Sequence, residues 1–255
     1  MRILVTNDDG VGAPGLAVLA LALRAAGHDL VVAAPLVDFS GSGAAIGPVH
    51  LSDGVTFEEE AIEGLSGVPV YGLDGPPALA VMAARLGGFG AAPDLVVSGV
   101  NPGNNTGRAV IHSGTVGAAL TAANFGVSGV AVSVAWGDEP HFDTGAALAV
   151  AAVAWLLEAP PRTVLNVNAP GLPLDRVRGV RTARLAPFGT ARTTFVGAGD
   201  GRLEMEMQDT DVELDPDTDT ALVRAGYVAV SELTGVRSVE LSAAGTDIGR
   251  LLTGG

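Results

Sequence analysis

The sequence predicts an α/β fold built on a mainly parallel β-sheet, and three observations support that class. Short aliphatic and β-branched runs bounded by Gly, Pro, Asn or Asp alternate with longer Ala- and Leu-rich segments, as in βαβ units. The 255 residues are 48% hydrophobic, which is enough to bury a large core in one domain. The chain contains no cysteine, so disulfides and cysteine-bound zinc play no part in its stability.

Five runs are predicted as strands of the sheet because each is short, apolar and bounded by residues that favour turns. These strands are Arg2–Thr6, Asp29–Ala34, Asp94–Ser98, Val130–Val134 and Val164–Val167.

Helices are predicted between these strands. The first follows Pro14, which suits the first turn of a helix, and it places Leu16, Leu19 and Leu23 on one face. The remaining helices are Pro77–Leu86, a helix that begins near Ser113, and Asp143–Leu157 with Asp143 as its N-cap.

The pattern changes after Pro170 to short strand-like pieces separated by polar and Gly-rich turns. The predicted elements there are antiparallel hairpins from Gly179–Leu185, Leu203–Met207 and Tyr227–Leu233, then a closing helix near Thr246–Leu252. We therefore expect a single domain, residues 1–255, made of an α/β body over 1–170 and a hairpin and C-terminal arm over 171–255 that serves oligomerisation.

The charge of the chain limits its partners. The net charge is −14, from 28 acidic against 14 basic residues, and the basic residues form no cluster, which argues against binding to long nucleic acid. The chain enters a strand at Met1–Thr6 without a signal-peptide pattern, and no apolar run reaches the length of a membrane span. We expect a cytoplasmic protein with no membrane association.

The first strand is followed by the pattern G-x-G-x-x-G, formed by Gly10, Gly12 and Gly15, with Asp8 and Asp9 directly before it. A dinucleotide site would need an acidic residue at the end of the second strand, and that strand ends in apolar residues and Pro35. Two carboxylates at the turn would also repel a pyrophosphate unless a cation lay between them. A turn capped by an Asx side chain is the ordinary alternative. The functional alternative is that the two carboxylates bind a divalent cation.

Three other loops lead to the same edge of the sheet, where open α/β sheets bind ligands. Asn101 follows the Asp94–Ser98 strand, and Ser40 lies in a Gly- and Ser-rich loop after the second strand. The segment His112–Thr115 enters a helix with hydroxyl groups and free backbone N–H groups, which either cap the helix or bind an anion. Acidic, amide and hydroxyl groups beside such a helix start predict a hydrolytic phosphate site.

These residues resemble the SurE (survival protein E) family of metal-dependent 5′/3′-nucleotidases and acid phosphatases, and the resemblance covers nearly the whole chain in the family's order. The matching segments are Asn7–Gly10, Ala13–Gly15, Ser40–Gly41, Pro93–Asn101, Gly103, Asn105, Ser113–Val116, Ala131–Ser133, Leu165–Asn168 and Gly226–Val228.

The resemblance implies a Rossmann-like three-layer body with a hairpin and a C-terminal arm exchanged between subunits of a homodimer or homotetramer. It implies one divalent cation per subunit, Mg²⁺ or Mn²⁺ with Ca²⁺ also able to bind, and a small phosphate ester as substrate. The implied metal ligands are Asp8, Asp9, Ser40 and Asn101, the two aspartates also being the catalytic residues, and the implied phosphate-binding residues are Gly41, Asn105, Ser113, Gly114 and Thr115.

Three positions depart from the family's pattern. Phe39 stands where the family usually carries Arg, and Gly43 stands where it carries a second Ser, with Ser42 shifted by one. The family's Gly-Thr-Pro segment appears here as Asp74-Gly-Pro-Pro77, with an extra carboxylate at Asp74. A lost cation and an added carboxylate both disfavour a polyanionic substrate.

The leading hypothesis is therefore hydrolysis of nucleoside monophosphates. The alternatives are a pathway-specific phosphatase of a modified nucleoside or sugar phosphate and, in another class, a catalytically silent metal- or nucleotide-binding protein. The sequence leaves open whether Asp8 acts as a general base or as a nucleophile. It also leaves open whether His112 donates a proton to the leaving group. Trp136 either stacks on a base or covers part of the hydrophobic core at the rim of the sheet.

Overall fold

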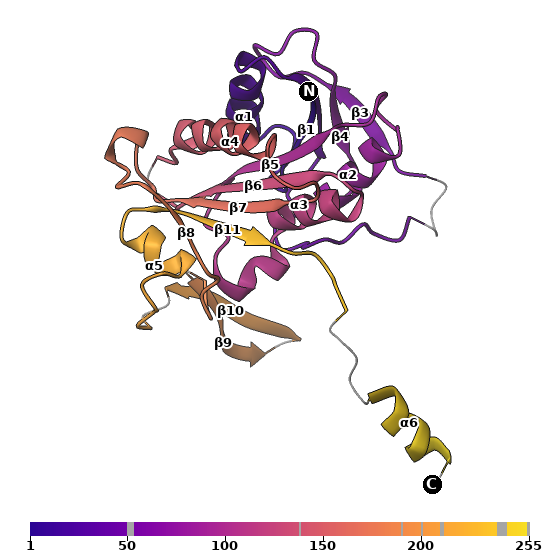
Figure 1. The fold of residues 1–255 in the computed structure, drawn as a ribbon, viewed down its shortest axis with the longest axis vertical. Helices are drawn as coiled ribbons and strands as arrows, with labels where there is room; N and C mark the ends of the chain where they lie inside the picture. Colours follow the sequence, from indigo (N-terminus) through magenta and orange to yellow (C-terminus); the bar gives the residue numbers. More distant parts are fainter. Residues whose placement is uncertain are drawn as a thin grey trace.

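The computed structural model describes residues 1–49, 54–137, 139–189, 191–199, 201–209, 212–238 and 244–253. Within these residues, a nine-stranded sheet forms the centre of the molecule (Figure 1). Its strands, in spatial order, are β3 (Phe57–Glu60), β4 (Val70–Leu73), β2 (Asp29–Pro35), β1 (Arg2–Thr6), β5 (Leu95–Pro102), β6 (Ser128–Val134), β7 (Val164–Ala169), β11 (Val228–Leu233) and β8 (Val180–Thr182).

The sheet is mainly parallel, as the sequence predicts. The strands from β4 to β7 all run in one direction, and only β3 and β11 pair antiparallel with their inner neighbours. The chain passes from β1 outward to β2 and returns to the other side of β1 with β5. The strand order therefore reverses between β1 and β5, and open α/β sheets bind ligands at the carboxyl ends of the strands beside such a switch point.

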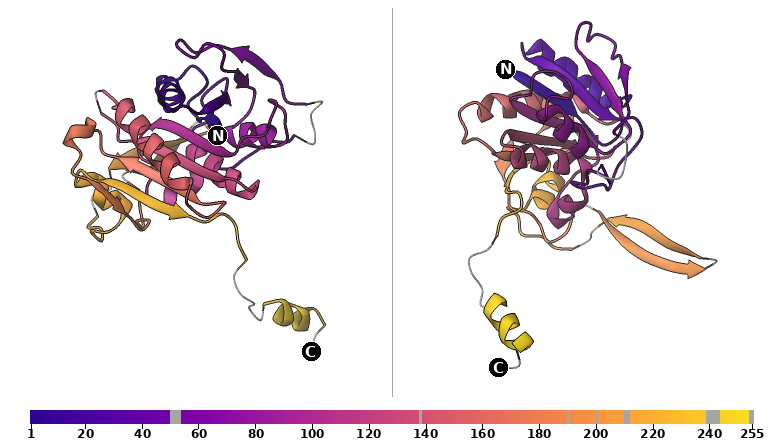
Figure 2. Two further views of the ribbon diagram at one scale, coloured as in Figure 1. Left: turned by 45° about the horizontal axis from the view of Figure 1, so that its top comes forward. Right: turned by 90° about the vertical axis from the view of Figure 1, so that its right-hand side faces the viewer.

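Helices cover both faces of the sheet and complete a three-layer α/β body (Figures 1 and 2). On one face α1 (Pro14–Ala25) packs against α4 (Phe142–Leu156), and on the other α2 (Pro77–Arg85) packs against α3 (Gly114–Asn124). Asp143 lies in the first turn of α4, and the N-cap is His141, so the predicted capping role of Asp143 is wrong. A carboxylate in the first turn still favours the helix through the helix dipole.

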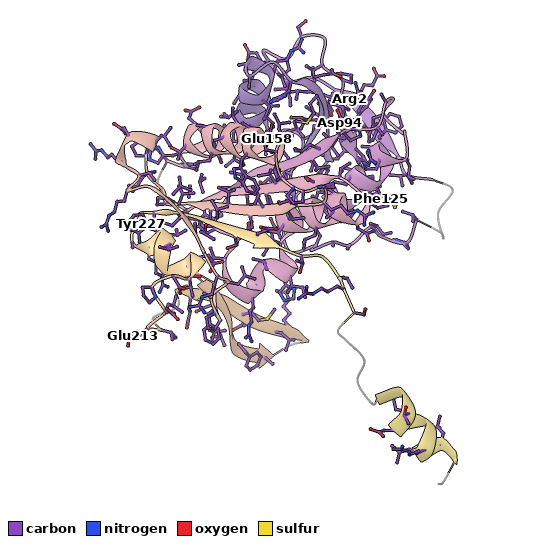
Figure 3. All side chains as sticks on the ribbon, in the orientation of Figure 1. Arg2, Asp94, Phe125, Glu158, Glu213 and Tyr227 are labelled. Atoms are coloured by element: carbon purple, nitrogen blue, oxygen red, sulfur yellow. The ribbon has the colours of Figure 1, made fainter. Side chains whose placement is uncertain are left out.

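The amino-terminal ends of β1 and β5 are joined by polar contacts at the edge of the sheet opposite the switch point. The backbone N–H of Arg2 donates to Asp94 at 2.9 Å, and the Arg2 guanidinium pairs with Asp29 at 3.0 Å. Arg2 and Asp94 lie side by side at the surface (Figure 3).

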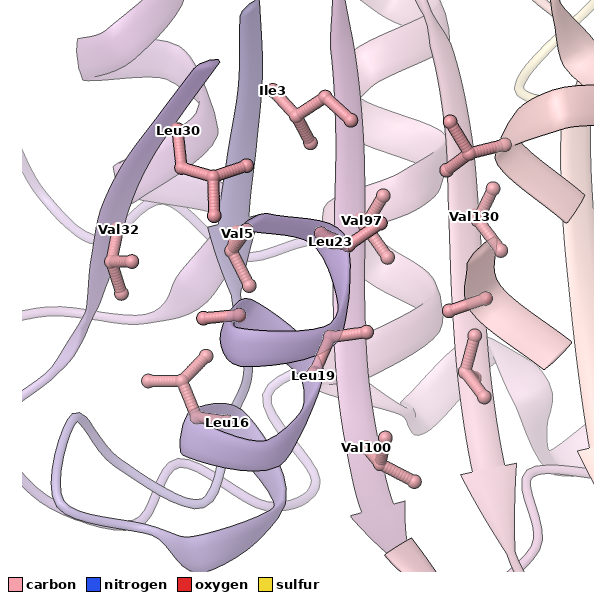
Figure 4. Close-up of a cluster of buried hydrophobic side chains, with 14 of the residues drawn as sticks. Ile3, Val5, Leu16, Leu19, Leu23, Leu30, Val32, Val97, Val100 and Val130 are labelled. Carbon is pink, nitrogen blue, oxygen red and sulfur yellow. The ribbon is translucent and has the colours of Figure 1, made fainter. Parts of the chain in front are cut away.

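The core beneath α1 explains the position of that helix. Leu16, Leu19 and Leu23 are fully buried, and they lie over Val5 and Val97 of the central strands (Figure 4). Leucines at these spacings form one apolar stripe on a helix, and Pro14 at its start fixes where the stripe begins.

The region after residue 170 contributes to the body as well as projecting from it. The strands β8 and β11 join the central sheet, so the expectation that Gly179–Leu185 and Tyr227–Leu233 form separate hairpins is wrong. Among the described residues of this region, β9 (Ala191–Gly199) and β10 (Arg202–Asp209) form the one separate hairpin, which points away from the body in Figure 2. The short helices η2 (Leu174–Arg176) and α5 (Asp219–Arg224) flank it in the chain, and α6 (Ala244–Thr253) lies apart from the body (Figure 1).

None of the helices in the described parts of the chain is long and apolar enough to cross a membrane.

The third glycine of the G-x-G-x-x-G pattern provides a test of the packing between α1 and β5. A Cβ atom on Gly15 would overlap the carbonyl oxygen of Val100 and lie 3.1 Å from Phe142, whereas a Cβ atom on Gly12 would have no atom within 4 Å. We expect Gly15→Ala to lower the melting temperature by roughly 4 to 10 °C, because a tightly packed interface tolerates no added methyl group. The matched Gly12→Ala variant should melt within about 2 °C of the wild type. Equal melting temperatures for the two variants would contradict this account of the packing.

Candidate active site

The candidate site lies at the switch point of the sheet, where Asn7, Asp8 and Asp9 follow β1 and Asn101 lies at the carboxyl end of β5. The side chain of Asn7 is fully buried and bonds with Gly10 in both directions: its amide donates to the Gly10 carbonyl at 3.1 Å, and its oxygen accepts from the Gly10 N–H at 3.3 Å. These two bonds close the turn, so the carboxylates of Asp8 and Asp9 are held at the carboxyl edge of the sheet.

Asp8 is buried against the first turn of α3. Its side chain is 3% exposed, and Oδ1 accepts a hydrogen bond from the Thr115 hydroxyl at 2.5 Å. A Cβ atom placed on Gly114 would lie 2.7 Å from Oδ2 of Asp8 and 2.8 Å from Oγ of Ser42. The absence of a side chain at Gly114 is therefore what allows the helix start to approach the carboxylate this closely.

The surroundings disfavour the charged forms of both carboxylates. Burial raises the pKa of Asp8 above its usual range, against the opposing effect of the Thr115 hydrogen bond. Burial, followed by repulsion from Asp8 and then Asp38, raises the pKa of Asp9 to about 7. Within the described residues, Oδ2 of Asp9 is buried and has no hydrogen-bond partner. A buried, unpaired carboxylate oxygen beside a second carboxylate has the chemistry of a ligand for a hard divalent cation, so these residues fit such an ion.

The loop after β2 brings Ser40 to the same edge. The Phe39 N–H donates to the Asp8 carbonyl at 2.8 Å, and the Ser40 N–H donates to Asp38 at 2.7 Å. The hydrogen bond from Ser40 holds the pKa of Asp38 below its usual range. Ser40 and Gly41 are exposed, and no hydrogen bond among the described residues joins the Ser40 hydroxyl to Asp8 or Asp9.

The far end of this loop is fixed to the start of α3. The Gly43 N–H donates to the His112 carbonyl at 3.0 Å, and Oγ of Ser42 is buried without a partner in the described part of the chain. Gly43 has a φ of +56°, and a Cβ atom there would lie 2.7 Å from the Ile111 carbonyl. A serine at position 43 would therefore be strained, and the hydroxyl that approaches Asp8 comes from Ser42 instead.

The predicted amide ligands are Asn101, at the end of β5, and Asn105, on the loop after it. The Asn101 amide nitrogen donates to the Gly103 carbonyl at 2.5 Å, which leaves its Oδ1 atom as the acceptor available to a ligand. Three neighbours hold Asn105. Its backbone N–H donates to Asn168 at 2.8 Å, and its backbone carbonyl accepts from Asn166 at 2.8 Å and from Asn168 at 3.0 Å. Its side-chain amide donates to Ser133 at 2.9 Å.

The start of α3 has the features of an anion site. Ser113 is the N-cap, and its Oγ accepts from the Val116 N–H at 3.1 Å. Because Oγ acts as the acceptor there, the hydroxyl hydrogen of Ser113 is available to another acceptor. The positive end of the helix dipole lies behind Ser113, Gly114 and Thr115, and it favours negative charge at this position.

Sequence reasoning gave no role to three residues that position the site. Asn166 and Asn168 belong to a segment that matches the family, but only the structure shows that they hold Asn105. Asp219 is fully buried and accepts from the N–H groups of Gly107 at 2.8 Å and Ala186 at 2.9 Å. It thereby fixes η1 (Gly107–His112), which leads into Ser113. In the sequence, Asp219 ends the acidic segment Asp209–Asp219, and nothing near it distinguishes it from the other aspartates of that segment.

The electrostatics of Asp9 give a prediction for the metal-free protein. Its folded pKa, about 7, lies above the usual value of 3.8, so the folded state holds a proton that the unfolded state releases between these values. The stability that Asp9 contributes is thus present below pH 4 and is lost as pH rises through 7. We expect Asp9→Asn to raise the free energy of unfolding in chelator by roughly 1 to 3 kcal/mol at pH 8 and by much less at pH 5.

Denaturant titration at the two pH values would measure this, with Asp74→Asn, an exposed carboxylate at the end of β4, as the matched control. A gain at pH 8 that Asp74→Asn reproduces would contradict the assignment of the effect to repulsion within the site.

Comparison with known proteins places this arrangement in a family. The family model described as "Survival protein SurE" matches residues 3–191. The 5′/3′-nucleotidase SurE of Shigella dysenteriae is 42% identical over 190 residues, covering 72% of this chain and 69% of that protein. The 5′-nucleotidase SurE of Xylella fastidiosa is 39% identical over 192 residues, covering 72% and 70%. The crystal structure of the SurE protein from Aquifex aeolicus superposes with a TM-score of 0.78 at 27% identity, over 99% of this chain and 100% of that one. The chain belongs to the SurE family.

Proposed function

We propose that this protein is a divalent-cation-dependent phosphomonoesterase that hydrolyses nucleoside monophosphates, a 5′/3′-nucleotidase. Relatives are named 5′/3′-nucleotidase or 5′-nucleotidase. The observation in this chain that supports the proposal most strongly is the pair of adjacent carboxylates, the buried Asp8 and the half-buried Asp9, with Asp8 lying against the amino terminus of α3. The carboxylates need a cation, and the helix start favours an anion. A phosphate ester bridging a cation and a helix amino terminus satisfies both requirements.

The residues that would hold the cation are Asp8, Asp9, Ser40 and Asn101. Two carboxylates, a hydroxyl and an amide carbonyl are all oxygen donors, which suits Mg²⁺ or Mn²⁺. When bound, such an ion supplies charge neutralisation for the phosphate and lowers the pKa of a coordinated water.

The phosphate would be held by Asn105, Ser113 and the backbone of Gly41, Gly114 and Thr115. Ser113 can donate its free hydroxyl hydrogen to a phosphate oxygen while its oxygen caps α3. The Thr115 hydroxyl donates to Asp8 instead, so this side chain orients the carboxylate and leaves phosphate contact to its backbone. These groups are preorganised to stabilise charge on the equatorial oxygens as the ester bond breaks.

Asp8 is the residue placed for proton transfer or attack. The Thr115 hydrogen bond fixes Oδ1, and Oδ2 lies on the Gly114 side, toward the proposed phosphate position. Both roles stay open: Oδ2 either accepts a proton from the attacking water or forms the bond to phosphorus itself.

A second candidate is a phosphatase of a modified nucleoside or sugar phosphate on the same scaffold. Two features favour it: Phe39 stands in place of the family's Arg in the loop that bonds to Asp8, and Asp74 is exposed at the carboxyl end of β4, two strands from β1. The predicted cytoplasmic location, and the predicted lack of membrane and long nucleic acid partners, stay predictions.

Phosphate release from a panel of monoesters tests the function directly. We expect release that requires Mg²⁺ or Mn²⁺, stops in chelator, is greatest with nucleoside monophosphates, and falls at least about 1,000-fold in Asp8→Asn. Release confined to a sugar phosphate would support the second candidate. A purified protein that binds the cation, measured by calorimetry, but releases no phosphate from any ester would contradict both enzymatic functions and favour the binding protein.

We also propose that the protein is a homodimer or homotetramer. Apolar side chains are exposed on the projecting hairpin, at Phe195, Leu203 and Met205, and on α6, at Ile248, Leu251 and Leu252. Two separate elements that expose apolar side chains away from their own body are suited to contact another copy.

Substitution of Ile248, Leu251 and Leu252 together by Ser should therefore reduce the molecular mass measured by light scattering, because it removes apolar area from the contact. The matched control on the same helix is Asp247→Ser with Arg250→Ser, which changes only charge. An unchanged mass for the apolar triple variant, or a wild type that is already monomeric, would contradict the role of α6.

A further inference from the structure

Trp136 is a large aromatic side chain at the rim of the candidate site for which the proposed function has no role. It lies two residues beyond β6, at the edge of the sheet that carries the site, and it is 76% exposed. Because one exposed aromatic residue is ordinary on a protein surface, its contacts decide whether it has a function.

The indole ring lies over the loop after β5. A Cβ atom on Gly103 would clash with Nε1 of Trp136 and lie 3.1 Å from Cδ1 and Cε2. The Gly103 N–H donates to the Val134 carbonyl at 2.7 Å, which ties this loop to the end of β6. The ring is therefore supported from beneath by backbone, and most of its surface faces solvent.

The same glycine connects the ring to the proposed metal ligand. The Gly103 carbonyl accepts the hydrogen bond from Asn101, and Asn105 lies two residues further along the loop. The indole thus contacts a glycine that lies two positions from Asn101 and two positions from Asn105, the residues that would contact the cation and the phosphate.

The floor of the site is closed, so the organic group of a bound ester must extend toward this rim. Asn7, Thr115 and Ser133 are fully buried beneath the phosphate position. A phosphate held among Asp8, Asn105 and α3 leaves only the solvent side for the rest of the substrate.

We infer that Trp136 is a stacking platform for the base of the nucleotide, and that it determines specificity for aromatic over non-aromatic phosphate esters. The inference rests on the proposed function. A supported, solvent-facing indole presents a π-face at no conformational cost, and every nucleobase has a π-face that can stack on it. The platform adds no charge, so it attracts a base without adding repulsion to an acidic site.

Kinetics with a matched pair of substrates test this. Adenosine 5′-monophosphate and ribose 5-phosphate share the sugar phosphate and differ by the base. We expect Trp136→Ala to raise KM for adenosine 5′-monophosphate about 5- to 100-fold with kcat changed less than about twofold, and to change KM for ribose 5-phosphate less than about twofold. Trp136→Phe should restore most of the loss. Equal KM changes for both substrates, or a loss confined to kcat, would overturn the inference.

Fluorescence supplies a readout that does not require catalysis. Trp136 and Trp155 are the two tryptophans of the chain, and Trp155 lies on α4 away from the candidate site. In a Trp155→Phe protein loaded with Mg²⁺, adenosine 5′-monophosphate should quench the emission of Trp136, and ribose 5-phosphate should reverse this quenching by competition without quenching itself. No quenching by adenosine 5′-monophosphate overturns the platform even if the wild type hydrolyses it. Quenching without hydrolysis sustains the platform and shows that the proposed function fails.

Discussion

The placement of two adjacent carboxylates, the buried Asp8 and the half-buried Asp9, where their charge is disfavoured is the constraint on which the rest of the site depends. Asp8 and Asp9 lie at the edge of the sheet where burial raises both pKa values, and repulsion from Asp8 raises that of Asp9 further. Such a pair is tolerated only where the surroundings supply positive potential or a cation. The surrounding elements meet this requirement in part: the amino terminus of α3 and the Thr115 hydroxyl act on Asp8, while one oxygen of Asp9 stays unpaired in the described structure.

The loops around this pair are held mostly by neutral hydrogen bonds. Asn166 and Asn168 bind the backbone of Asn105, and Ser133 binds its side chain. Because amide side chains carry no charge, they fix a loop without altering the potential at the carboxylates. The exception, Asp219, is buried at the other end of the loop and accepts from two backbone N–H groups of different segments. The position of the helix start proposed to bind phosphate thus depends on a residue 112 positions from Gly107 in the chain.

The sequence predicts those parts of the fold whose signals are local. The apolar runs of β1 and β7 and the leucine stripe of α1 define their elements, since each pattern is set by one buried face. The strand β3 was missed because its residues, Phe57–Glu60, include three glutamates; charge is unfavourable in a buried strand but common on an exposed edge. The partners of β8 and β11 could not be predicted, because a strand pattern says nothing about which neighbour it pairs with. The role of the Thr115 side chain could not be predicted either: the family resemblance implies contact with phosphate, whereas in the structure its hydroxyl donates to Asp8.

The departures from the family pattern have different physical causes. Gly43 is explained by the backbone: its φ of +56° and the nearby Ile111 carbonyl leave no room for a serine, and Ser42 brings a hydroxyl to the helix start instead. Phe39 is not explained by packing in this way, because its backbone bond to Asp8 is one that any residue except proline could make. The change from Arg to Phe removes a positive charge from this loop. A site that has lost a cation binds less through charge, and an aromatic rim at Trp136 offers a neutral source of affinity in its place.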